Sequence, residues 1–112
     1  AADTDAGARL AKRRCAACHT FDEGGKNKIG PNLWNVVGRD KASLDGFRYS
    51  AALKSLEGKW TYEDLASFLE RPKAYAKGTK MTFAGLKNVE DRASIIAFLR
   101  AMADEPAPLP RE

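Results

Sequence analysis

The residues best suited to chemistry stand together in RRCAACHTF, residues 13–21. This stretch holds both cysteines of the 112-residue chain, Cys15 and Cys18, and its single histidine, His19. Three chemistries use such a group: a redox dithiol, part of a metal site, or covalent attachment of a cofactor. A redox dithiol is expected beside a βαβ pattern, which this sequence lacks. Structural zinc needs four Cys or His ligands, and these three residues are too few.

Covalent haem attachment is the interpretation that the spacing favours. Cys-x-x-Cys-His is the attachment signature of c-type haem. Cysteines three positions apart lie on one helical face, where each can form a thioether with a haem vinyl group. The histidine that follows then places its imidazole beneath the iron. A surface disulfide with an unrelated histidine is the alternative.

An iron bound by His19 has a second axial position, and the chain has no other histidine to fill it. The two methionines are Met81 and Met102. Met102 belongs to the apolar stripe of the last expected helix, which favours core packing. Met81 lies in KGTKMTFAGLK, which has no helical stripe. Ligation by Met81 is therefore the stronger interpretation, and Met/His ligation raises the reduction potential of a haem iron.

The elements expected to position these residues are helices joined by long loops. Helices are predicted at AGARLAKRRCAACH (6–19), SAALKSL (50–56), TYEDLASFLERP (61–72, stopping at Pro72) and NVEDRASIIAFLRAMAD (88–104). Polar residues that cap helix N-termini precede each of them. The expected caps are one of Asp3, Thr4 and Asp5, then Ser50, Thr61 with Asp64 in capping-box spacing, and Asn88.

The remaining segments are expected to be irregular. Residues 22–48 hold five of the nine glycines and show little apolar periodicity, which indicates a long loop. Such a loop is unusual in a compact domain unless it wraps something. The last helix should bury Ile95, Phe98, Leu99 and Met102 on one face. No segment alternates like a strand, so the fold class is predicted to be all-α.

Composition narrows the possible functions. Nineteen Lys and Arg residues against 15 Asp and Glu give a net charge of +4, which favours acidic partners. The chain has no basic run with interleaved aromatic residues, so nucleic-acid binding is not predicted. No apolar run is long enough to span a membrane, so no stable membrane insertion is expected. The start, AADTD, is compatible with cleavage after an export signal.

Over nearly its whole length the chain closely resembles class I cytochrome c, especially the bacterial cytochrome c-two type and mitochondrial members. The resemblance rests on CAACHTFDEGGKNKIGPNLW, VVGR, GFRYS, a tryptophan at 60, FLERPKAYAKGTKMTFAGLK and IIAFL. It implies a class I cytochrome c fold, with about five helices and long loops around a covalently bound haem. It also implies one domain over residues 1–112, with 106–112 as an extended tail.

The resemblance assigns roles to residues around one haem c, attached through Cys15 and Cys18. His19 would be the proximal ligand, oriented by the carbonyl of Pro31, and Met81 would be the distal ligand. Tyr49 and Trp60 would donate hydrogen bonds to a propionate. The remaining residues implied near the haem are the polar Arg39 and Thr79, beside the same carboxylates, and the apolar Leu33, Phe68, Leu69 and Phe83, packed against it.

Three residues depart from the family pattern. Phe68 stands where a tyrosine is common and cannot donate a hydrogen bond toward the methionine sulfur. Leu53 replaces an asparagine near the inner propionate, and Ala11 replaces an aromatic residue of the first helix. That helix is implied to cross the last one, with Gly7 allowing close approach and Phe98 filling the contact.

The function implied is that of a soluble one-electron carrier, not an enzyme, acting as a monomer between membrane redox complexes. Its basic ring would comprise Arg14, Lys28, Lys73, Lys80 and Lys87, and would dock transiently on acidic faces. A cytochrome bc complex would be the donor, and a photosynthetic reaction centre or terminal oxidase the acceptor. The expected compartment is the periplasm, with the mitochondrial intermembrane space as alternative. A peroxidase or gas-binding haem protein, and a membrane-surface or signalling role, are the competing functions.

Overall fold

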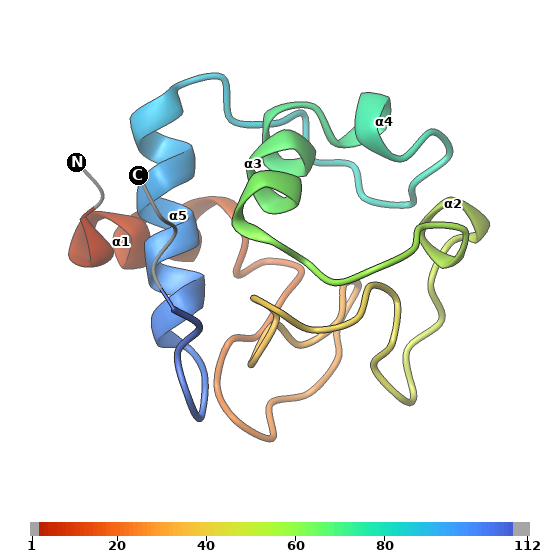
Figure 1. Cartoon of the computed structure of the whole chain (residues 1–112), viewed down its shortest axis with the longest axis horizontal. Helices are drawn as coiled ribbons and strands as arrows, with labels where there is room; N and C mark the ends of the chain where they lie inside the picture. Colours follow the sequence, from red (N-terminus) through yellow and green to blue (C-terminus); the bar gives the residue numbers. More distant parts are fainter. Residues whose placement is uncertain (1–2, 109–112) are drawn as a thin grey trace.

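The computed structural model describes residues 3–108, which form five helices joined by long irregular segments (Figure 1). The helices are α1 (Thr4–Arg14), α2 (Ala51–Lys54), α3 (Tyr62–Glu70), α4 (Pro72–Tyr75) and α5 (Val89–Ala101). The only β-pairing within residues 3–108 is an isolated antiparallel bridge between Asp40 and Lys59. The prediction of an all-α fold is confirmed.

The predicted N-caps are present at four helices. Asp3 accepts hydrogen bonds from the backbone N–H groups of Asp5 and Ala6 at the start of α1. Ser50, Thr61 and Asn88 cap α2, α3 and α5 in the same way. Each side-chain oxygen satisfies donors that the first helical turn leaves without partners, and this explains why the helices begin where they do.

The prediction that the first helix continues through His19 is wrong. α1 ends at Arg14, and Cys15 is its C-cap, with φ −121°. The backbone N–H groups of Cys18 and His19 both donate to the carbonyl of Cys15 at 3.0 Å, so the attachment residues form a separate turn. A neighbouring loop supplies donors to this turn, because Lys28 Nζ lies 2.7 Å from the Ala16 carbonyl oxygen.

The prediction that a helix stops at Pro72 is incomplete, because Pro72 also begins the next helix. α3 ends at Glu70, and Pro72 opens the short helix α4 as its first residue. Proline suits this position because its fixed φ is helical and the first turn needs no N–H donor. The chain therefore turns at Arg71 and continues into a second helix, which leads toward Met81.

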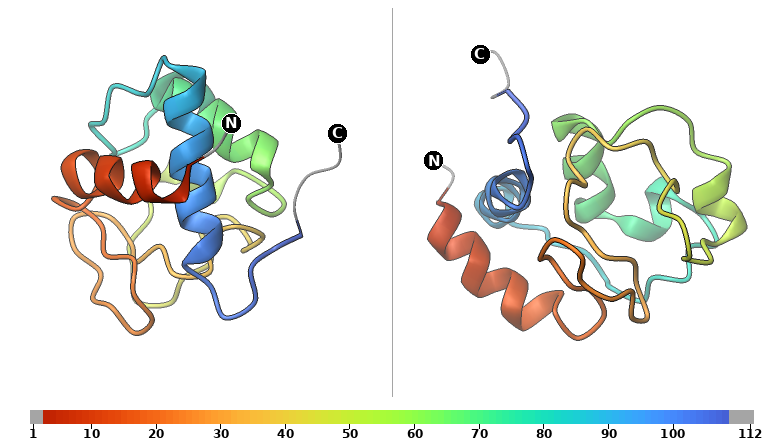
Figure 2. Two further views of the ribbon diagram at one scale, coloured as in Figure 1. Left: turned by 90° about the vertical axis from the view of Figure 1, so that its left-hand side faces the viewer. Right: turned by 90° about the horizontal axis from the view of Figure 1, so that it is seen from below.

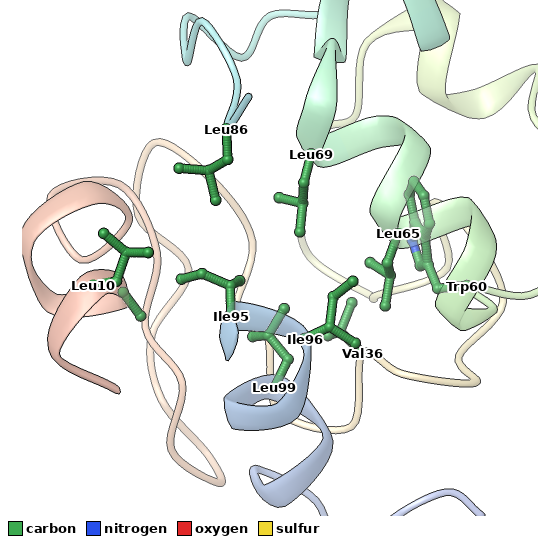
Figure 3. Packing of buried hydrophobic residues seen from close by; sticks show 10 residues of the cluster. Leu10, Val36, Trp60, Leu65, Leu69, Leu86, Ile95, Ile96 and Leu99 are labelled. Atoms are coloured by element: carbon green, nitrogen blue, oxygen red, sulfur yellow. The ribbon is translucent and has the colours of Figure 1, made fainter. Parts of the chain in front are cut away.

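The core forms where α1 and α5 cross and where α3 packs beside α5 (Figure 2). It contains Leu10, Ala11, Val36, Trp60, Leu65, Leu69, Leu86, Ile95, Ile96 and Leu99 (Figure 3). Ala11 and Ile95 are each 1% exposed, so the replacement of an aromatic residue by Ala11 leaves a well-buried crossing. Phe98 packs edge-on against Phe21, with ring centroids 5.2 Å apart.

Gly7 allows the two helices to approach closely. A Cβ atom at this position would overlap the carbonyl oxygen of Ser94 and would lie 3.0 Å from Cβ of Phe98. The carbonyl belongs to the α5 backbone and cannot turn away as a side chain would. The expected role of Gly7 in the crossing agrees with this geometry.

Replacing Gly7 with alanine should lower the free energy of unfolding by about 3 kcal/mol, because the methyl group forces the helices apart. An exposed glycine inside a helix would instead gain stability from this change, by roughly 0.5–1 kcal/mol. Denaturant unfolding of the holoprotein measures the difference. Ala6→Gly, one residue earlier, is the control and should cost no more than about 1 kcal/mol. A Gly7→Ala protein as stable as the original would contradict the crossing.

The chain folds back after α5. The Asn35 N–H donates to the Met102 carbonyl at 2.9 Å, and the Asn35 side chain forms two hydrogen bonds with Asp104. Met102 is half-buried at the helix end and lies outside the core cluster, so the prediction of core packing is wrong for this residue. Residues 106–108 are irregular, and the rest of the expected tail, 109–112, lies outside the described residues.

None of the helices within residues 3–108 combines the length and the apolar character needed to cross a membrane.

Candidate functional site

The turn after α1 presents Cys15, Cys18 and His19 together. Both cysteines are half-buried, and they form no disulfide with each other. Burial raises the pKa of the Cys15 thiol more than the charge of Arg14 lowers it. Residues 3–108 contain no group of three or more His, Cys, Asp or Glu side chains placed to hold a metal ion. The turn therefore offers two thiols and one imidazole on a rigid support.

His19 is held in one orientation by a backbone carbonyl. Its Nδ1 lies 2.8 Å from the carbonyl oxygen of Pro31. A carbonyl can only accept, so Nδ1 carries the proton and Nε2 keeps its lone pair. Burial lowers the pKa of His19, and the positive charges of Arg39 and Lys28 lower it further. The hydrogen bond to Pro31 raises the pKa but does not offset these effects. The neutral imidazole thus has the tautomer that a metal ligand requires.

Gly30 forms the wall against which the imidazole packs. A Cβ atom at Gly30 would lie 2.7 Å from Nδ1 and 2.8 Å from Nε2 of His19, and closer still to Cε1. The Gly30 N–H donates to the Cys18 carbonyl at 2.8 Å, and its own carbonyl accepts from the Lys28 N–H. These two bonds hold the backbone of Gly30 in place, so only a residue without a side chain fits beside the ring.

Arg39 has a buried donor without a partner. Its Nη1 donates to the carbonyls of Asn32 and Trp34, at 3.2 and 3.1 Å, whereas its buried Nε has no acceptor within residues 3–108. Burial lowers the pKa of Arg39, as expected for a cation that lacks a nearby anion. A haem propionate would supply such an anion. The residues present therefore fit the predicted cofactor.

Two aromatic residues have the polar groups that the prediction requires. The Tyr49 hydroxyl oxygen accepts a hydrogen bond from the Leu44 N–H at 3.1 Å, so its own proton is available to another acceptor. Trp60 is buried in the core, and no hydrogen bond from its indole is found among the described residues. Both can donate toward a carboxylate, as expected for residues near a propionate.

The apolar residues of the predicted site lie around the same core. Leu69 belongs to the core cluster, and Leu33, Leu53, Phe68 and Phe83 are partly buried against it. Phe68 packs against Trp60, with ring centroids 5.2 Å apart. Apolar groups in these places can shield a porphyrin from water.

Met81 lies in the irregular segment between α4 and α5, which loops beneath α4 and returns past α3 toward α5 (Figure 1). Its backbone N–H donates to Thr79 Oγ1 at 3.2 Å, and the Thr79 N–H donates to the Ala76 carbonyl. The Met81 side chain is half-buried. None of these contacts tests ligation of an iron by Met81, so this role stays a prediction.

The five basic residues predicted to dock partners are all exposed: Arg14, Lys28, Lys73, Lys80 and Lys87. Within the part of the chain that the structure describes, none of them forms an ion pair. The Arg14 guanidinium lies over the ring of Phe83, 5.4 Å from its centroid. Lys87 Nζ lies 3.2 Å from the Glu70 carbonyl oxygen. These charges are available to an acidic partner.

The sequence did not single out two residues that support the site. Gly30 could be suspected only from its place before Pro31, since nothing local predicts contact with His19. Asn32 is buried, and its side-chain nitrogen donates to Thr20 Oγ1 at 2.8 Å and to the Asp22 carbonyl at 2.9 Å. Asn32 thus fixes the loop whose carbonyls hold Arg39, and one isolated asparagine gives no pattern from which to infer this.

Residues 4–103 match the cytochrome c family. The chain belongs to this family. Members of the cytochrome c family carry covalently bound haem in electron transport, so the chain binds haem c through Cys15 and Cys18, and its fold is that of class I cytochrome c. The resemblance inferred from the sequence is confirmed.

Relatives within the cytochrome c family come from bacteria and plants. The chain is 46% identical over 110 residues to a protein of Bradyrhizobium diazoefficiens named cytochrome c homolog, covering 97% of this chain and 59% of the relative. It is 46% identical over 100 residues to cytochrome c-type cyt cy of Rhodobacter capsulatus, covering 89% and 49%. Cytochrome c of Stellaria longipes is 49% identical over 98 residues, covering 88% and 91%. The chain therefore spans only half to three-fifths of these two bacterial relatives.

Proposed function

We propose that the chain carries single electrons between membrane redox complexes and that His19 and Met81 are the axial ligands of its haem. The hydrogen bond between His19 Nδ1 and the Pro31 carbonyl carries this proposal, because it leaves Nε2 free to bind a metal. When bound, haem c supplies an iron that alternates between the ferrous and ferric states. Ligation by Met81 would leave no open position for oxygen or peroxide, so we expect no enzymatic activity.

The residues around the site would bind the cofactor and exclude water. The donors proposed for the propionates are Arg39, Tyr49, Trp60 and Thr79. The buried Nε of Arg39, which has no acceptor among the described residues, supports this role. Leu33, Phe68 and Phe83 are proposed to pack on the porphyrin, as their partial burial against the core suggests. A dry and rigid surround keeps reorganisation small when the charge of the iron changes.

The exposed basic residues would steer the chain toward acidic docking faces and release it quickly. We propose a cytochrome bc complex as donor and a photosynthetic reaction centre or terminal oxidase as acceptor. The contacts would be transient and the carrier a monomer. Thioether attachment takes place outside the cytosol, so we propose the periplasm as the compartment, with the mitochondrial intermembrane space as the alternative.

Two measurements test this function together. A redox titration of the purified holoprotein should follow a reversible one-electron curve. The rate of its oxidation by a membrane oxidase, or of its reduction by a bc complex, should fall by at least about tenfold as salt rises from low to several hundred millimolar. Screening of the basic ring explains the decrease.

A neutral small-molecule reductant provides the control, since its rate should change little with salt. A partner reaction indifferent to ionic strength would remove the steering argument. A ferrous protein that readily binds carbon monoxide would favour the gas-binding or peroxidase alternative.

A further inference from the structure

Lys41 is a buried lysine with specific partners and no role in the site described so far. Its side chain is 6% exposed, although its residue lies on the long loop between α1 and α2. Its Nζ donates to Oδ2 of Asp64 at 3.0 Å and to the hydroxyl of Tyr75 at 2.9 Å. Desolvation lowers the pKa of Lys41, but the hydrogen bonds that its ammonium donates to Tyr75 and Asp64, together with their charges, outweigh it and raise the pKa. Lys41 is therefore charged.

The Lys41 ammonium also faces aromatic rings. It lies 5.2 Å from the ring centroid of Trp60 and 5.5 Å from that of Tyr75. These two rings stack on each other, with centroids 5.9 Å apart, and Phe68 packs against both. The faces of aromatic rings attract a cation, and more strongly when the cation is shielded from water. Lys41 thus contacts Trp60, which is proposed to donate to a haem propionate.

Lys41 connects the loop to two helices. Its backbone N–H donates to the Gly58 carbonyl at 3.0 Å, which fixes the loop beside the segment that leads to Trp60. Asp64 belongs to α3, and Tyr75 is the last residue of α4. One ammonium group therefore holds α4 against both α3 and the loop.

The segment that carries Met81 is suspended between two attachments. One is Tyr75, and from the next residue, Ala76, hydrogen bonds run through Thr79 to Met81. The other is the far end, where the Leu86 N–H donates to the Leu69 carbonyl at 2.7 Å. Several residues between these attachments are exposed: Lys77, Gly78, Lys80, Thr82 and Ala84. Phe83 packs partly against the core within this stretch. Because the residues around Met81 are otherwise largely exposed, the position of the segment depends strongly on its ends.

We propose that Lys41 is a positioning residue: by anchoring Tyr75 at the end of α4, it keeps the Met81 segment closed over the haem. This inference rests on the proposed ligation by Met81. Loss of the ammonium would leave the Tyr75 hydroxyl and the Asp64 carboxylate without their shared donor. The Tyr75 attachment would loosen, and Met81 would yield more easily to another ligand.

Added imidazole tests the inference, since it can bind the ferric haem only by displacing Met81. Lys41→Met keeps the length of the side chain and removes its charge. We expect this substitution to raise the affinity of the ferric holoprotein for imidazole about tenfold, because one charged hydrogen bond that holds the segment is lost. Tyr75→Phe keeps the ring but loses the hydroxyl, and should raise the affinity about threefold. Lys41→Arg should restore near-original affinity, because it keeps both the charge and the contact with the rings.

Lys59→Met is the matched control. Lys59 Nζ pairs with Asp40 at 3.3 Å on the surface, with side chains 66% and 68% exposed, close to Lys41 in the fold. This change should leave imidazole affinity unaltered. Denaturant unfolding of each variant gives its overall stability, so that a change in imidazole affinity can be compared with a general loss of stability.

Two outcomes decide the matter. If Lys41→Met and Tyr75→Phe bind imidazole like the original protein, even with a lower unfolding midpoint, Lys41 is only structural and the inference is wrong. If the original ferric protein has no sulfur-to-iron absorption band, the proposed ligation by Met81 fails instead. If Lys41→Met does not fold, the imidazole affinity of Tyr75→Phe, compared with that of the original protein, decides between these outcomes.

Discussion

Gly30→Ala is expected to weaken ligation by His19 severely. The added methyl group would occupy space taken by the imidazole, within 2.8 Å of both ring nitrogens. The backbone of Gly30 cannot retreat, because Cys18 and Lys28 hold it through hydrogen bonds. The ring must turn away from Pro31 and lose the bond that fixes its tautomer. We expect the yield of protein with a low-spin haem spectrum to fall at least tenfold, since overpacking here costs about 1–3 kcal/mol.

Gly24→Ala is the control for the Gly30 substitution. Gly24 lies in the same loop at φ +75°, with no atom within 4 Å of a Cβ atom built there. Its substitution should cost about 1 kcal/mol of stability from backbone strain and leave the spectrum unchanged. The absorption spectrum and the haem content of the purified proteins measure both effects. Normal ligation in Gly30→Ala would show that the imidazole does not pack where the structure places it.

Met81→Ala should open the second axial position. Carbon monoxide binds a ferrous haem only when that position is free, and in the original protein Met81 is expected to fill it. Without competition from the sulfur, the apparent affinity for carbon monoxide should rise more than about a hundredfold. The reduction potential should fall, because Met/His ligation raises it. Optical titration with carbon monoxide and redox titration of the same samples measure both changes.

The chain offers a matched control in its second methionine. Met102 is half-buried beyond the end of α5, where its carbonyl accepts from the Asn35 N–H. Met102→Ala should leave carbon monoxide binding and the potential as they are. If Met102→Ala opens the iron and Met81→Ala does not, the assignment of the distal ligand is wrong.

Helix starts could be predicted from sequence because capping is local. Asp3, Ser50, Thr61 and Asn88 each bind N–H groups two or three residues away. Helix ends were predicted less well, because they depend on distant partners. The turn at Cys15 is completed by Lys28, from another loop, and no pattern near the cysteines reveals this.

The same distinction applies to the site. Cys15, Cys18 and His19 are adjacent in sequence, so their chemistry could be inferred from spacing alone. The contact of Gly30 with His19 and the bonds of Lys41 to Asp64 and Tyr75 join residues from different elements. Lys41 looks like any other surface lysine in the sequence. Only the tertiary fold shows that it is buried.

The carbonyl contacts of two basic residues affect how a partner would be bound. Lys28 Nζ is fixed by the Ala16 carbonyl and Lys87 Nζ by the Glu70 carbonyl. A lysine that is free in solution loses side-chain entropy when a complex immobilises it, at a cost of about 0.5–1.5 kcal/mol. Lys28 and Lys87 have already lost part of that freedom in the unbound protein. Their ammonium groups are thus already held in position and can attract an acidic surface with little further loss of side-chain entropy.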